Sequence, residues 1–124
     1  MTTNKPVSRV GLLISPDLFF TSKVTGTAQA LGLRVDSVDD VATAASRLQA
    51  GGVGCILLDL VAPRVSVADL VAAMPDSARV PVIAFGSHVN VELLESARLA
   101  GAEVMPRSQF SAALPKILTD HLAR

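Results

Sequence analysis

The sequence predicts a single doubly wound α/β domain, in which helices cover both faces of a five-stranded parallel sheet. Three observations predict this fold class. Short apolar runs alternate five times with segments of helical periodicity, the connections between them are short, and the hydrophobic half of the chain is mostly aliphatic. Parallel strands need helical crossovers and are buried on both faces, which suits such a composition.

Five short apolar runs are the predicted strands. The third run is the most continuously apolar and ends before Pro63, so we place it at the centre of the sheet. The second run is the least apolar, which suits an edge. Pro81 has to lie at the start of the fourth strand, because proline cannot donate a ladder hydrogen bond. The predicted strands are residues 9–14, 33–37, 53–60, 79–85 and 102–105.

Capping residues and helical periodicity predict the five helices. Ser15 is expected to cap the first helix, with Pro16 at its first position. Pro115 must fall in the first turn of the last helix, or that helix bends there. The predicted helices run from Pro16 to about Leu31, from Asp39 or Asp40 to Gly51, from Ser66 onwards, from Asn90 to about Ala100, and from about Ser111 to Leu122.

The domain organisation is simple. Residues 1–8 form a polar N-terminal tail that lacks the apolar stretch of a signal peptide. Residues 9–124 have the length of one domain and hold all five strand–helix units, without a linker or a low-complexity tract.

Composition and charge exclude several classes of function. Eleven Lys and Arg residues balance eleven Asp and Glu residues, and Trp and Tyr are absent, so nucleic-acid binding has no support. No segment approaches the roughly 20 apolar residues of a membrane span. The one cysteine, Cys55, lies in an apolar run and cannot form an internal disulfide, so a cytoplasmic location is expected.

The candidate functional residues lie where the predicted strands end. In an open parallel sheet, ligands bind outside the carboxyl ends of the strands. Asp59 ends the third strand and Arg107 follows the fifth, so the two are expected to pair across the crevice. The other candidates at this edge are Ser15, Asp17, Gly86, Ser87, His88 and Ser108. Small residues, hydroxyls and helix amino ends around one crevice favour a phosphate or carboxylate ligand.

Three segments resemble the response-regulator receiver family. The segment Cys55–Pro63 is similar to the apolar third strand with its phosphoacceptor aspartate and proline loop. The segments Val80–Phe85 and Ala100–Arg107 are similar to the fourth strand and to the turn and strand that follow it. This resemblance implies a flavodoxin-like strand order of 2-1-3-4-5, with Asp59 at the phosphoacceptor position. It also implies that a homodimer or a protein partner uses the fourth helix, the fifth strand and the fifth helix.

The sequence departs from the receiver pattern around Asp59. The family's acidic pair, which holds Mg²⁺ after the first strand, reads Ser15 and Pro16 here, with Asp17 one place further on. Gly86 stands where the family carries Thr or Ser. Arg107 matches the family's lysine only after a one-residue adjustment, and it is no isosteric replacement. We therefore expect no cofactor, with Mg²⁺ held by Asp17 and Asp59 as the alternative.

Three interpretations of function remain open. The first is a non-enzymatic, atypical receiver-like signalling module that acts through protein contacts without conventional phosphorylation. The second is a phosphoacceptor receiver that uses Asp59 with a degenerate Mg²⁺ site. The third is a domain that binds a small anionic ligand in a crevice at Gly86, Ser87 and Arg107. The sequence offers neither a nucleophile–base pair at a recognisable spacing nor a zinc-type ligand cluster, so an enzyme is not expected.

Overall fold

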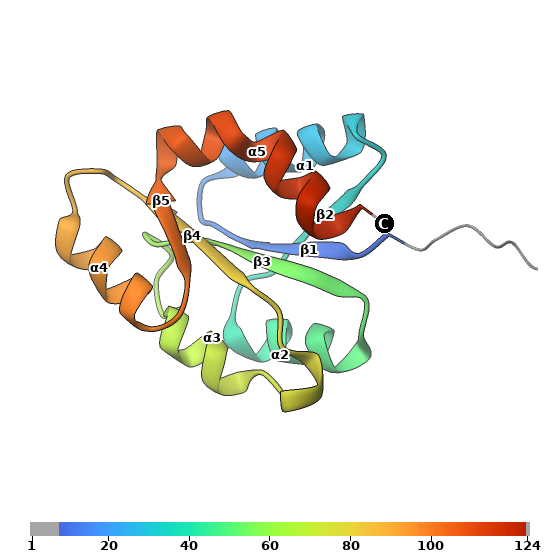
Figure 1. The fold of residues 1–124 in the computed structure, drawn as a ribbon, viewed down its shortest axis with the longest axis horizontal. Coiled ribbons are helices and arrows are strands. Elements are labelled where there is room, and N and C mark those ends of the chain that lie inside the picture. The colour runs from blue at the N-terminus through green and yellow to red at the C-terminus, as the bar shows by residue number, and fades with distance from the viewer. Residues whose placement is uncertain (1–7, 124) are drawn as a thin grey trace, which may run out of the picture.

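The computed structural model describes residues 8–123, which form one five-stranded parallel sheet between two layers of helices (Figure 1). The strand order is β2-β1-β3-β4-β5, as predicted. The strands are β1 Val10–Ile14, β2 Arg34–Ser37, β3 Val53–Asp59, β4 Val82–Gly86 and β5 Glu103–Pro106. The helices are α1 Leu18–Ala30, α2 Val41–Ala50, α3 Val67–Ala73, α4 Val91–Leu99 and α5 Arg107–Leu122, with a 3-10 turn at Asp76–Ala78. Nearly all of the predicted tail, residues 1–8, lies outside the described residues.

Two apolar layers fill the space between the sheet and its helices. Helices α1 and α5 cover one face of the sheet, and α2, α3 and α4 cover the other (Figure 1). Strand β3 lies at the centre, as predicted, and all seven of its residues are buried. The layer beneath α1 and α5 contains Phe20, Phe85 and Phe110, whereas the opposite layer is built from Leu, Ile, Val, Ala and Met side chains.

Three helices begin with a side-chain cap. Asp17 caps α1, because its Oδ1 accepts a 3.0 Å hydrogen bond from the Phe20 amide. The prediction that Ser15 would cap this helix was wrong, since the Ser15 hydroxyl donates a hydrogen bond to Asp59 and accepts none from the amides of α1. Asp40, one of the two predicted candidates, caps α2, and Ser66 caps α3 as predicted.

Helix α5 begins at Arg107, four residues before the predicted start at Ser111. The early start carries no capping signal, because Pro106 precedes the helix and makes no side-chain bond to it. Pro115 therefore lies inside the helix and not in its first turn, and its missing N–H leaves the Ser111 carbonyl without a helical donor. Among the described residues, no helix is both long enough and apolar enough to cross a membrane.

Cys55 lies in the buried layer beneath α5 and is a free thiol. Burial raises the pKa of this thiol from its ordinary 9.0 to about 12. The thiol therefore stays protonated at neutral pH and acts as a small apolar side chain. Its contribution to stability is complete below pH 9 and is lost as the pH rises toward 12, because the unfolded chain ionises first.

Candidate functional site

Asp59 is the centre of the candidate site. It ends β3, and among the described residues it is the one polar or charged residue that is fully buried. Its Oδ2 accepts hydrogen bonds of 2.8 Å from Ser15 Oγ and from Arg107 Nη2. Its Oδ1 accepts a 3.2 Å bond from the Val61 amide. Both oxygens are therefore engaged, which is how a folded chain tolerates a buried carboxylate.

Arg107 reaches Asp59 from the first position of α5, so the predicted contact between the two is present. The guanidinium carbon lies 4.7 Å from the centre of the Phe20 ring and 5.3 Å from that of Phe85. The sequence does not predict these aromatic contacts, because packing in the core alone accounts for an apolar ring on a helix or a strand. The one sequence signal is that Phe85 directly precedes the candidate Gly86. The contacts fix the cation over two ring faces.

Asp17 and Ser15 complete this group, which we call the Asp59 cluster: Ser15, Asp17, Asp59 and Arg107. Arg107 Nη1 is 3.8 Å from Asp17 Oδ2, an ion-pair distance that is too long for a hydrogen bond. Ser15 Oγ accepts a 3.1 Å bond from the Asp17 amide while donating to Asp59. Four candidates from three segments of the chain thus converge at the carboxyl edge of the sheet.

The remaining candidates line a hollow beside the cluster. It has a volume of about 350 Å³ and is lined by Val61, Gly86, Ser87, His88, Pro106, Arg107 and Ser108. Ser87 Oγ accepts a 3.4 Å bond from the Val89 amide. Ser108 is the second residue of α5, and neither α4 nor α5 has a side-chain cap, so neither serine caps a helix.

Gly86 is not required by the packing of this hollow. A Cβ built at this position would meet Leu60 atoms at 3.5 Å and Leu94 Cδ2 at 3.6 Å, which are ordinary contact distances. The backbone there also lies outside the left-handed region that favours glycine. A small side chain such as that of serine would therefore fit at Gly86. The absence here of the Thr or Ser hydroxyl that the receiver pattern predicts is not forced by a lack of space.

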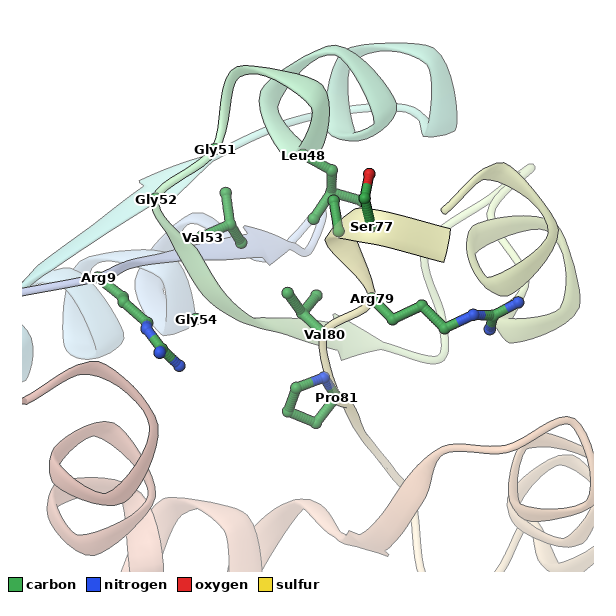
Figure 2. Close-up of a pocket in the computed structure, with 11 residues that line it drawn as sticks. Arg9, Leu48, Gly51, Gly52, Val53, Gly54, Ser77, Arg79, Val80 and Pro81 are labelled. Carbon is green, nitrogen blue, oxygen red and sulfur yellow. The ribbon is translucent and has the colours of Figure 1, made fainter. Parts of the chain in front are cut away.

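A second hollow, of about 310 Å³, lies at the opposite, amino edge of the sheet (Figure 2). Apolar side chains of Leu48, Val53 and Val80 face this hollow beside Gly51 and Gly52, which precede β3. Figure 2 shows the Arg79 side chain extending away from Arg9, so the two guanidinium groups do not form a clamp. This hollow shares no residue with the Asp59 cluster.

Within residues 8–123, no group of three or more His, Cys, Asp or Glu side chains is arranged to hold a metal ion. The two carboxylates that the sequence analysis names as alternative Mg²⁺ ligands, those of Asp17 and Asp59, both contact Arg107.

Solved structures with the same architecture identify the fold. The receiver domain of sensor histidine kinase PA1611 from Pseudomonas aeruginosa PAO1, solved with a magnesium ion in its active-site cleft, matches 93% of this chain and 98% of its own, with a TM-score of 0.74 and 22% identity. The fold is that of a response-regulator receiver domain. The phosphorylated cyanobacterial phytochrome response regulator RcpA covers 94% of this chain and 99% of its own (TM-score 0.73, 16% identity). The beryllofluoride-activated NtrC4 receiver domain dimer covers 90% and 98% (TM-score 0.70, 18% identity). No protein-family model and no curated protein matches the sequence.

The charges of the Asp59 cluster are two carboxylates and one guanidinium. The loop after β1 contributes the Ser15 hydroxyl to the surroundings of Asp59, and Asp17 is partly used as a helix cap. The cation comes from Arg107, at the very start of α5. This arrangement fixes the position of a buried carboxylate and gives each of its two oxygens at least one hydrogen-bond donor.

Proposed function

We propose that this chain is a receiver-like signalling module that acts through contacts with another protein and is not phosphorylated on Asp59. One observation carries the proposal: both carboxylate oxygens of Asp59 are buried and already hydrogen-bonded to Ser15, Val61 and Arg107. A carboxylate that attacks a phosphate donor needs a free, approachable oxygen. The buried, unpaired thiol of Cys55 suits a reducing compartment, so we place the module in the cytoplasm.

The contact surface that we propose comprises α4, β5 and α5. Helix α4 buries only Ala97, whereas Val91 and Leu99 are 66% and 79% exposed. Exposed apolar side chains on a thinly packed helix are typical of a surface that another protein covers. The NtrC4 receiver domain forms a dimer, which supports a second copy or a related partner as the occupant.

Acetyl phosphate is expected to leave the mass of the protein unchanged, with or without Mg²⁺. Transfer would form an acyl phosphate on an Asp59 oxygen and release acetate, and the hydrogen bonds from Ser15 and Arg107 oppose that attack. Intact-protein mass spectrometry measures the outcome. Gain of one phosphoryl group in the wild type, abolished by Asp59→Asn, would refute the proposal and favour a phosphoacceptor receiver that works with a degenerate Mg²⁺ site.

Leu99→Glu is expected to weaken self-association or partner capture by about tenfold or more, since a charge replaces a leucine that becomes buried on contact. Analytical ultracentrifugation and affinity copurification measure the effect. Leu18→Glu is the matched control, because Leu18 is also 79% exposed but lies on α1, outside the proposed surface. Equal effects of the two substitutions would argue against this surface.

A small anionic ligand is the second candidate function. It is favoured by the hollow beside Arg107, where Gly86, Ser87 and Ser108 leave room next to a cation. The carboxylates of Asp59 and Asp17 already pair with that cation and repel an anion, so we rank this function second. A rise in melting temperature with added phosphate or acetate, lost in Arg107→Ala, would favour it.

A further inference from the structure

The guanidinium of Arg107 lies in a gap between two carboxylates. Its Nη1 is 3.8 Å from Asp17 Oδ2, and its Nη2 is 2.8 Å from Asp59 Oδ2. The two carboxylates reach the gap from different elements, the start of α1 and the end of β3. Carboxylate oxygens that face one gap are also the ligands that Mg²⁺ and related ions prefer.

A divalent ion does not fit these residues as they stand. Asp59 Oδ2 already accepts bonds from Ser15 and Arg107, and its Oδ1 accepts one from Val61. Mg²⁺ needs oxygen ligands at about 2.1 Å in near-octahedral geometry, and the Asp59 oxygens are not free to serve while Arg107 is bound. The guanidinium and the ion have the same sign of charge, so they repel each other and cannot share the gap.

Arg107 is also held in place by its surroundings. The buried rings of Phe20 and Phe85 lie against its guanidinium, and two-thirds of the side chain is covered. Withdrawal would break the ion pair to Asp59 and the contacts with both rings. Because the cation is covalently part of α5, it loses no translational freedom on binding, whereas a dissolved ion does.

We infer that Arg107 is a tethered cation that takes the place of a divalent metal ion between Asp17 and Asp59 and conceals a site for such an ion. This inference rests on the proposed function, since a domain without a phosphoryl group on Asp59 has no need of an ion to offset its charge. The intact chain therefore does not respond to Mg²⁺ or Mn²⁺. Removal of the Arg107 side chain opens a site with two carboxylates for one divalent ion.

Titration with Mn²⁺ alone, followed by electron paramagnetic resonance, tests this inference. Wild-type protein is expected to leave the Mn²⁺ free, whereas Arg107→Ala is expected to bind one ion per chain. The melting temperature of Arg107→Ala is expected to rise by about 5 °C when Mn²⁺ is present at about ten times its dissociation constant. The wild type is expected to show no rise.

Three further variants make the result specific. Arg107→Gln keeps most of the side-chain volume and is expected to bind Mn²⁺ too, which covers the case in which Arg107→Ala does not fold. Adding Asp59→Asn to Arg107→Gln is expected to abolish binding. Arg47→Ala is the matched control, because it removes a guanidinium that lies 2.8 Å from a different carboxylate, that of Asp36, and is expected to create no site.

Two outcomes would overturn the inference. One is a Mn²⁺ ion bound by the wild type and lost in Asp59→Asn, and the other is the absence of binding by folded Arg107→Gln. Both are measured without a phosphate donor or a protein partner. Failure of this inference is therefore distinguishable from failure of the proposed function, which is tested by acetyl phosphate and by the Leu99 variant.

Discussion

Replacing Arg107 with alanine is expected to lower the free energy of unfolding by about 2–4 kcal/mol. The substitution leaves the fully buried carboxylate of Asp59 without its positive partner, so that only Ser15 and Val61 remain as donors. Arg107 is 34% exposed, so water reaches the vacated space and limits the loss. A thermal melt is expected to show a midpoint lower by roughly 8–15 °C.

A double-mutant cycle distinguishes a buried ion pair from general damage to the core. Adding Asp59→Asn to Arg107→Ala is expected to recover much of the lost stability, because it removes the unpaired charge. Arg79→Ala is the matched control, since it breaks a 3.6 Å contact to Asp76 in which both side chains are exposed, and is expected to leave the midpoint unchanged. Additive effects of the two single substitutions in the cluster would contradict the pairing.

Gly54→Ala is expected to destabilise the fold by about 3 kcal/mol or more. A Cβ at this position would lie 2.3 Å from the His121 carbonyl oxygen and 2.9 Å from atoms of Arg9 and Leu122. The nearest of these is backbone, and the Arg9 amide holds the same end of α5 through a 3.0 Å hydrogen bond to the Leu122 carbonyl. The end of α5 therefore has to move away from β3, and chemical denaturation measures the loss.

Gly26→Ala is the matched control for this substitution. Gly26 lies inside α1, and a Cβ there would have no atom within 4 Å. Alanine is therefore expected to stabilise the protein by about 0.5–1 kcal/mol through its better helix propensity. If Gly54→Ala were as stable as the wild type, the close approach of α5 to β3 would not require glycine at this position.

Much of the architecture could be predicted from local patterns. The apolar run at the third strand places β3 in the sheet centre, and the polar second run places β2 at an edge. Alternation of strands and helices does not by itself give the order of the strands, which came from the resemblance to receivers. The start of α5 was missed because Pro106 offers no side-chain cap, and a helix without a cap has no local marker of its first residue.

The candidate site was predictable in its position but not in its internal contacts. Asp59 and Arg107 could be paired because one ends a strand and the other follows a strand at the same edge of the sheet. The predicted role of Ser15 as a helix cap was wrong, because its hydroxyl bonds the Asp17 amide before the helix and the distant carboxylate of Asp59. Tertiary packing decides between such partners, and it also turns the rings of Phe20 and Phe85 toward the guanidinium.

Helix α5 is anchored at both ends and contains a proline between them. Its 16 residues span about 24 Å, with Arg107 tied to Asp59 at one end and Leu122 packed near Gly54 at the other. Pro115 removes a hydrogen bond in the middle, which makes that point the easiest place for the helix to bend. Bending at Pro115 would let the half of the helix that carries Arg107 move while the other half keeps its contact with Gly54 at the amino edge of the sheet.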